Sequence, residues 1–280
     1  MLTRIHSAGG DFLRSRFRLV STRSFAMHLG NGALTPECAA LAFGVAGVGL
    51  GAAAMDIVRT KSAVSGKKLA MVAALGLFVF AAQMFNVPVL PGISAHLVGG
   101  VLLAWMLGPS LGAWTMAIVL AVQAIALGDG GLSSLGANIV NMALLPAGAV
   151  YVLRWLDYQK SYATAVAAGF TVVLAALLIP LETALFRFGS ELAGWSDFAG
   201  RMLLSHLAAG AIEGALTLAL LLAFSPAKAS AAGSRFWWQT SLLRGAFCLA
   251  VFATLVNCRT ELPDGYEAAA ESSGLAWLLR

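Results

Sequence analysis

The stretch ATAVAAGFTVVLAALLIPLETALF, residues 163–186, decides the class of fold. It holds a single charged residue, Glu182, in a run long enough for one helix to cross a hydrocarbon core about 30 Å thick. Similar runs recur along a chain that is 59% hydrophobic and only 11% charged. Soluble domains carry about 25% charged residues. The sequence therefore predicts an all-α, polytopic transmembrane helical bundle in a lipid bilayer.

The apolar runs predict about seven spans, followed by one additional C-terminal transmembrane helix. The third run is short and ends at Gly108-Pro109, so we expect that span to be tilted or only partly buried. The eight predicted spans cover residues 37–55, 69–87, 96–108, 111–127, 137–156, 163–186, 202–225 and 241–257.

The chain divides into four predicted parts. Residues 1–26 form a basic N-terminal extension, residues 27–225 the membrane domain, residues 226–240 a cytoplasmic linker, and residues 241–280 the last helix with an external tail. Lys and Arg favour cytoplasmic loops. The loops after the first, fifth and seventh spans are richer in them than the loops on the opposite side, so the start of the first span and the tail should face outside. The formal charge of +5 then requires no nucleic-acid partner.

Residues 1–26 break this pattern, because they carry five arginines and one acid, Asp11, on the predicted outer side. They also lack the apolar core of a signal peptide. Two interpretations are open: an extension that is removed or never translated, or a cytoplasmic arm with a different topology. We favour the first.

Polar, glycine-containing segments interrupt the apolar pattern at three places. They are MHLGNGALTPE (27–37), PGISAHLVGG (91–100) and GDGGLSSLGAN (128–138), the last followed by Asn141. All three fall on the predicted outer side. Non-helical backbone near a membrane is tolerated only where it is buried in protein or lines a cavity. The three segments together predict a lidded external pocket.

These segments resemble the CbiM/NikM family, the substrate-capture subunits of cobalt and nickel energy-coupling-factor (ECF) importers. A fourth block in the seventh predicted span, with His206, Gly210 and Glu213, is also similar to the family pattern. The resemblance covers about residues 27–225. One departure is Asn31, where the family commonly has Asp.

The resemblance implies a metal site built from nitrogen atoms. Its ligands would be the α-amine of Met27, the amide nitrogen and imidazole of His28, and the imidazole of His96. Four such nitrogens in a plane suit Ni²⁺ or Cu²⁺, and Co²⁺ is a plausible occupant. A peptide-bonded Met27 has no free amine, so we expect the mature chain to begin at Met27.

Several further residues are expected to support this site. Asn31, Asp129, Asn138 and Asn141 would position loops or ligands through hydrogen bonds. His206 and Glu213 lie seven residues apart, hence on one helical face, and serve either helix packing or gating and docking of a partner.

The tail carries a second resemblance. Its PDGYE sequence, residues 263–267, is similar to the Pro-Asp-Gly-x-Glu block of the small PDGLE/NikN-like auxiliary subunit of these importers, here partial and fused. The fusion slightly favours nickel over cobalt.

Together the resemblances imply import of Ni²⁺ or Co²⁺ as transported substrate, without a permanent cofactor, across the bacterial inner membrane. A transmembrane coupling (T) subunit and cytoplasmic ATPase subunits are the implied partners. The chain has no GxxxxGK[ST] motif, so ATP hydrolysis is expected on those partners and the chain itself is not expected to be an enzyme. The alternatives are an ATPase-independent permease or metal sensor, and an intramembrane enzyme built on His206 and Glu213.

Overall fold

The structure, a computed structural model, describes residues 28–60, 65–224, 246–247 and 249–279. Met27, the extension 1–26 and the linker 226–240 lie outside the described residues. The division of the chain into four parts therefore stays a prediction.

Six helices or continuous helical segments of the described chain are long and apolar enough to cross a membrane. This confirms the predicted all-α membrane bundle. They are α2 (Pro36–Arg59), α3 (Gly66–Gln83), α5 (Pro109–Val122) with η1 (Gln123–Leu127), the run η2 (Leu132–Ser134), α6 (Leu135–Ile139), η3 (Val140–Leu144) and α7 (Leu145–Trp155), then α8 (Ser161–Ala184) and α9 (Trp195–Phe224).

The predicted third span, 96–108, is not a membrane-crossing helix. A short antiparallel hairpin, β1 (Val87–Leu90) and β2 (Ile93–Ala95), precedes it, and only α4 (Gly100–Leu107) is helical. Gly99 ends the non-helical stretch with φ +75°, where a side chain would also meet Val79 at 2.8 Å. Gly108 ends α4 with φ +97°, a conformation that favours glycine. The two glycines thus confine this helix to eight residues.

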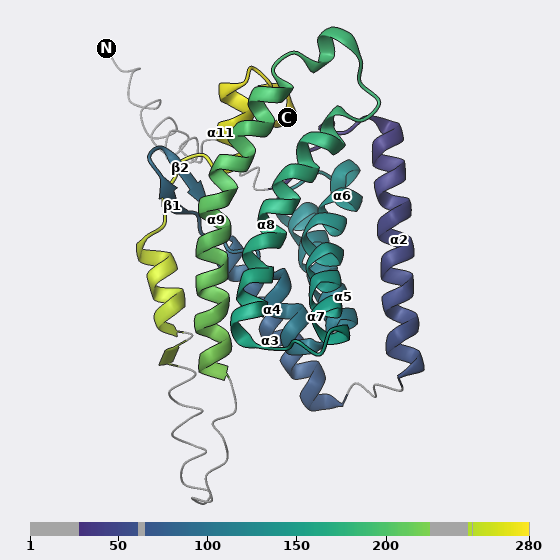
Figure 1. Cartoon of the computed structure of the whole chain (residues 1–280), viewed down its shortest axis with the longest axis vertical. Helices are drawn as coiled ribbons and strands as arrows, with labels where there is room; N and C mark the ends of the chain where they lie inside the picture. Colours follow the sequence, from purple (N-terminus) through teal and green to yellow (C-terminus); the bar gives the residue numbers. More distant parts are fainter. Residues whose placement is uncertain (1–27, 61–64, 225–245, 248, 280) are drawn as a thin grey trace, which may run out of the picture.

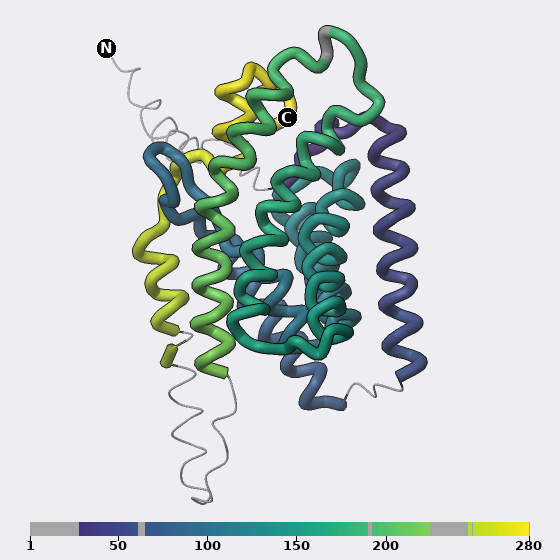
Figure 2. The backbone as a smooth tube through the Cα atoms, viewed as in Figure 1, coloured from purple at the N-terminus to yellow at the C-terminus, as the bar shows by residue number. Residues whose placement is uncertain are grey.

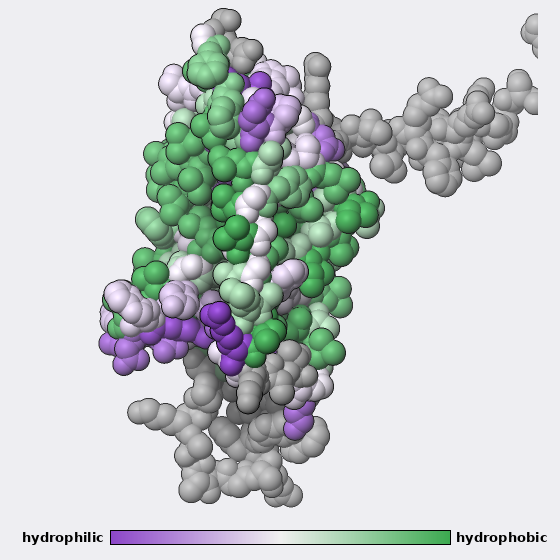
Figure 3. Space-filling model, turned by 90° about the vertical axis from the view of Figure 1, so that its right-hand side faces the viewer, coloured by the Kyte–Doolittle hydropathy of each residue, from purple (hydrophilic) through white to green (hydrophobic). Residues whose placement is uncertain are grey.

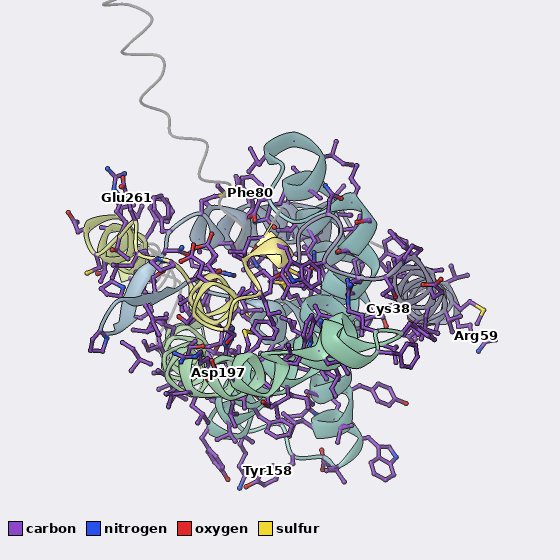
Figure 4. All side chains as sticks on the ribbon, turned by 90° about the horizontal axis from the view of Figure 1, so that it is seen from above. Cys38, Arg59, Phe80, Tyr158, Asp197 and Glu261 are labelled. Carbon is purple, nitrogen blue, oxygen red and sulfur yellow. The ribbon has the colours of Figure 1, made fainter. Side chains whose placement is uncertain are left out.

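The predicted last span, 241–257, is described only in part. Residues 249–257 are helical and stand at the edge of the bundle opposite α2, as Figure 2 shows. After them come α11 (Gly265–Ser272) and the 3₁₀ turn η5 (Ala276–Leu279), with the 3₁₀ turn η4 (Gly189–Leu192) at the same end. Seen from above, α11 and η5 lie over the middle of the bundle (Figure 4).

One end of the bundle collects the segments that the charge pattern places on one side. The hairpin, the start of α2 and α11 all lie there (Figure 1). Hydrogen bonds connect the segments at this end. Arg187 Nη2, just after α8, donates to Ala33 O before α2 at 3.3 Å, and Ser94 N in the hairpin donates to Pro263 O before α11 at 2.9 Å. Apolar side chains cover much of the face between the two ends (Figure 3). The fold confirms that these loops share one end, while the side of the membrane they face stays a prediction.

Glycines bring two helix pairs into close contact. In the α8–α9 pair, a Cβ on Gly169 would lie 2.6 Å from Gly210 O, and a Cβ on Gly210 would lie 2.7 Å from Gly169 O. In the α4–α5 pair, a Cβ on Gly112 would overlap the backbone of Ala104. Small residues let helices approach closely, where dispersion holds them together. Both close helix contacts are possible only because glycine has no side chain.

We predict that Gly112→Ala destabilises the bundle by about 1–3 kcal/mol, because the added methyl must push α4 and α5 apart. The matched control is Gly47→Ala on α2, where a Cβ meets nothing within 4 Å. Both changes raise helix propensity equally. Thermal melting of the purified proteins in detergent should show a lower midpoint for Gly112→Ala alone. Equal midpoints for both variants would contradict the close packing of α4 on α5.

Candidate functional site

The chain before α2 is held in place by the 128–138 loop rather than by regular secondary structure. Leu29 N donates to Asn138 Oδ1 at 3.2 Å, and Asn138 Nδ2 donates back to Leu29 O at 3.3 Å. Gly131 N donates to the same carbonyl at 2.8 Å. One side-chain amide thus pairs with both backbone groups of a buried residue. Asn138 therefore fixes the position of the residue that follows His28.

The next residues continue this docking. Ser134 Oγ donates to Gly30 O at 2.7 Å, while Asn31 Oδ1 accepts bonds from Ser133 N at 3.1 Å and Ser133 Oγ at 3.2 Å. A Cβ on Gly131 would overlap the backbone of Asn31, so glycine is required for this approach. Asn31 accordingly contacts the loop that it was expected to position.

His28 is buried, with 4% of its surface exposed. Its Nδ1 lies 3.1 Å from Asp129 Oδ1, so Asp129, expected to position loops or ligands, contacts His28 directly. Its Nε2 is buried and has no hydrogen-bond partner among the described residues. A buried imidazole nitrogen without a partner is costly unless something else binds it.

His96 follows β2 directly and approaches His28. The two ring centroids are 5.6 Å apart, and the ring planes are inclined at 60°. Two imidazoles that share one ion at about 2 Å from each nitrogen have centroids about 4–6 Å apart, depending on the angle at the metal. His96 Nδ1 lies 3.2 Å from Leu97 O, a contact that orients the ring. The separation fits joint coordination.

A cavity of about 80 Å³ adjoins both rings. It runs inward from the loops between α6, α8 and α9, and most of its surface is apolar. Its polar lining consists chiefly of His28, His96, Asn138, Asn141, His206 and Asp264.

Two of these lining residues are bound to neighbours. Asn141 Nδ2 donates to Glu182 Oε2 at 2.8 Å, whereas its Oδ1 is buried without a hydrogen-bond partner in the described chain. His206 Nδ1 lies 2.8 Å from Met202 O and 3.0 Å from Ser205 Oγ, both on its own helix. The local bonds of His206 indicate a packing role better than a ligand role. Glu213 does not line the cavity; it contacts the backbone that follows His96.

The tail contacts the hairpin that presents His96. Ser94 N donates to Pro263 O at 2.9 Å, and Ser94 Oγ donates to Leu262 O at 2.7 Å. Asp264 then starts α11 with a capping box, in which its Oδ1 accepts from Glu267 N at 2.8 Å and Glu267 Oε2 accepts from Asp264 N at 3.1 Å. Burial, with the nearby Glu267 charge, raises the pKa of Asp264 to about 8.

Further contacts hold α11 and η5 against the rest of this end. The Arg187 guanidinium lies over the Trp277 ring at 4.4 Å, and Trp195 packs against the same ring at 5.8 Å. Tyr266 OH donates to Leu278 O at 2.9 Å within the tail. Tyr266 and Leu29 belong to one buried apolar cluster. The tail therefore covers the segment that carries His28.

Sequence reasoning missed three residues near the site. Asp264 was part of a recognised motif, but its place beside the cavity depends on tertiary packing. Gln83 and Gln123 are both fully buried. Their hydrogen bonds connect the backbone of Asp129 with the backbone that follows His96. A signal for them existed, because uncharged polar side chains inside apolar spans usually form hydrogen bonds between helices.

Side chains alone do not complete a metal site in the described chain. Within the described ranges, no three His, Cys, Asp or Glu side chains lie close enough together to hold an ion. His28 and His96 therefore need further donors, and the backbone at Met27–His28 lies nearest in sequence. Met27 itself falls outside the described residues.

The chain matches the family model CbiM, described as a cobalt uptake substrate-specific transmembrane region, over residues 28–231. The chain belongs to this family. A protein of Archaeoglobus fulgidus with the provisional name fused nickel transport protein NikMN is 38% identical over 142 residues, which are 50% of this chain and 47% of that protein. A provisionally named metal transport protein of Haloquadratum walsbyi is 32% identical over 194 residues, 68% of this chain and 86% of that protein.

The fold of this CbiM-family chain also resembles a solved structure, the crystal structure of a truncated transition metal transporter. The TM-score is 0.60 at 28% sequence identity, over 70% of this chain and 96% of that one. The alignment to the Archaeoglobus protein covers only about half of that protein's length. The family, the membrane fold and the resemblance to metal transporters are thus shown.

We predict that Asn138→Leu releases the segment before α2. The substitution leaves the buried Leu29 N–H without its partner, at a cost of about 1–3 kcal/mol. Hydrogen–deuterium exchange should increase over residues 28–34. Asn257→Leu, which removes only a bond to Ala253 O on the same helix, is the control and should leave this segment protected. Unchanged protection in Asn138→Leu would show that other contacts hold the segment.

Proposed function

We propose that the chain captures Ni²⁺ or Co²⁺ at the extracytoplasmic face and acts as the substrate-binding subunit of an ECF-type importer. The observation that carries the proposal is the pair of imidazoles, His28 and His96, brought within 5.6 Å at the loop end of the bundle. The family of the chain and the names of its relatives support a transition metal as the substrate.

The proposed ligands are four nitrogens. The Met27 α-amine and the His28 amide nitrogen, each after loss of a proton, would complete a plane with the imidazoles of His28 and His96. The family resemblance implies this set, and the described residues offer no group of three His, Cys, Asp or Glu side chains in its place. Both imidazoles must be neutral to bind, so protons compete with the ion and affinity should rise with pH.

Asp129 has a definite task in this scheme. Its carboxylate lies 3.1 Å from His28 Nδ1, the ring nitrogen that must bind the ion when the His28 amide nitrogen binds it too, so the carboxylate can hold the ring only until the ion arrives. When the ion binds, the carboxylate also offsets part of its charge. Asn31, Asn138 and Asn141 would act through the loops and helices that they join.

Nickel fits this proposal better than cobalt. A planar set of four nitrogens matches a geometric preference of Ni²⁺. The tail that resembles the auxiliary subunit, together with the fused nickel transport name of one relative, supports the same choice. Residues 263–267 would then be the remnant of that subunit, in contact with the metal site through Ser94.

We predict that protein beginning at Met27 binds about one Ni²⁺ per chain, and that His28→Ala and His96→Ala each weaken binding at least about 100-fold. Loss of an outer-shell contact already costs about 10–100-fold, and a ligand should cost more. Isothermal titration, with metal analysis of the same samples, measures both quantities. His206→Ala, whose ring is bound within its own helix, is the matched control and should retain Ni²⁺.

A second form of the protein tests the amine directly. The same chain with one extra residue before Met27 should lose most of its affinity, and intact-mass analysis should show that the mature protein starts at Met27. Tight binding by protein that retains residues 1–26 would contradict the amine ligand. Equal metal content in wild type, His28→Ala and His96→Ala would contradict the whole site.

We further predict that nickel uptake requires ATPase partners. Cells that express this chain with a coupling subunit and ATPases should accumulate radioactive nickel, and cells with an ATPase whose phosphate-binding lysine is replaced should not. The chain has no phosphate-binding motif of its own, so P-loop hydrolysis of ATP could drive uptake only through partner subunits. Uptake that survives inactivation of the ATPases would favour a permease.

A further inference from the structure

A buried carboxylate binds the backbone immediately after His96. Glu213 Oε2 accepts a hydrogen bond from Val98 N at 2.9 Å, and Glu213 Oε1 accepts one from Gly99 N at 2.8 Å. Glu213 is 4% exposed. The two amides precede α4, whose first residue is Gly100. A carboxylate at the start of a helix also interacts favourably with the positive end of the helix dipole.

The carbonyl of the same peptide is bound from the other side. Gln83 Nε2 donates to Val98 O at 2.7 Å, and Gln123 Nε2 donates to Gln83 Oε1 at 2.9 Å. Both glutamines have no exposed surface. Val98 is therefore held through its N–H by α9 and through its carbonyl by α3.

The chain of hydrogen bonds continues to the other histidine. Gln123 begins the π-helical turn η1, and its carbonyl accepts a bond from Asp129 N at 3.1 Å. Asp129 in turn contacts His28. π-helical turns are rare and often lie at functional sites. One path of contacts thus leads from His28 through Asp129, Gln123 and Gln83 to the peptide two residues beyond His96.

We propose that Glu213, Gln83 and Gln123 are positioning residues that set the distance between the His28 and His96 imidazoles, and so determine how tightly the ion is held. The inference rests on the proposed function, since it concerns the geometry of the same metal site. None of the three side chains needs to touch the ion.

The physical reason is the tolerance of metal coordination. A binding site works only when its groups are held within about 0.5 Å of their required positions. His96 lies in a non-helical stretch between β2 and α4, where no regular backbone pattern sets its place. Hydrogen bonds from two different helices to a single peptide supply that restraint. Such bonds are expensive to leave unmade, because the groups are buried.

The test measures Ni²⁺ affinity and the visible absorption band of bound Ni²⁺, in whichever form of the chain binds Ni²⁺ in the experiment above. Glu213→Gln replaces one acceptor oxygen with an N–H₂ that faces a backbone N–H. Gln83→Leu removes two hydrogen bonds, the one from Gln83 to Val98 O and the one from Gln123 to Gln83. Each change should weaken binding about 10–100-fold and shift the band, as expected when an outer-shell contact is lost.

A double-mutant cycle tests whether the glutamines act as one chain. Gln123→Leu breaks only the link between Gln123 and Gln83, so it should have a smaller effect than Gln83→Leu. The double variant should bind no more weakly than Gln83→Leu alone, because contacts in one network are not additive. Thr217→Val, a buried change one turn beyond Glu213, is the control and should keep both affinity and absorption band.

The melting temperature of the metal-free protein separates positioning from stability. The inference holds if affinity and band change in Glu213→Gln and Gln83→Leu while Thr217→Val, at a similar melting temperature, binds as wild type. Wild-type affinity and band in both variants overturn it. If those two variants do not fold, the test rests on Gln123→Leu. Wild-type Ni²⁺ affinity and absorption band in Gln123→Leu then overturn the inference. Wild-type protein that binds no Ni²⁺ overturns instead the proposed function.

Discussion

The site depends on one constraint: backbone that is neither helix nor strand must find hydrogen-bond partners inside a bundle surrounded by lipid. Water cannot satisfy these groups in the membrane interior, and an unpaired buried amide costs several kcal/mol in hydrocarbon. The chain meets the constraint with side chains. Asn138 pairs with Leu29, and Glu213 pairs with Val98 and Gly99. The residues that solve this problem also place the two histidines.

The close fit of the loops follows from the same constraint. A side-chain amide can reach a backbone only if the two chains nearly touch, and Gly131 allows this for the segment after His28. Gly99 and Gly100 do the same for the stretch after His96, where added side chains would meet Val79 and Met142 O. The glycines of these loops therefore allow the chains to approach closely, and the polar residues nearby form the hydrogen bonds that hold the chains together.

Much of the architecture could be predicted from the sequence, because lipid leaves few alternatives. Long apolar runs such as 163–186 had to be helices, and the family-specific blocks placed His28 and His96 in one pocket. The end of α4 could be predicted from Gly108-Pro109, but its late start could not, since the apolar composition of the run matches that of a span. The backbone angle at Gly99 shows that the helix begins only at Gly100.

The supporting residues were harder to predict for a different reason. Gln83 and Gln123 are far apart in sequence and lie in runs that otherwise read as lipid-facing or packing surface. Their pairing is a property of how α3 meets the end of α5, which no local pattern records. Glu213 was identified as a functional or packing residue, but its two backbone partners depend on the break between β2 and α4. Asp264 reaches the cavity only because the tail folds back over the loops.

Electrostatics adds a last step to this picture. Asp129 is buried against His28, Glu213 against the backbone after His96, and Asp264 beside the cavity that both imidazoles line. Burying carboxylates is costly, and the pKa of Asp264, raised to about 8, shows how strongly its surroundings resist a negative charge. A dication nearby would lower that cost for all three groups at once. In the proposed site, nitrogen ligands with carboxylates behind them would therefore favour a divalent ion over a monovalent one, because the benefit grows with the charge of the ion.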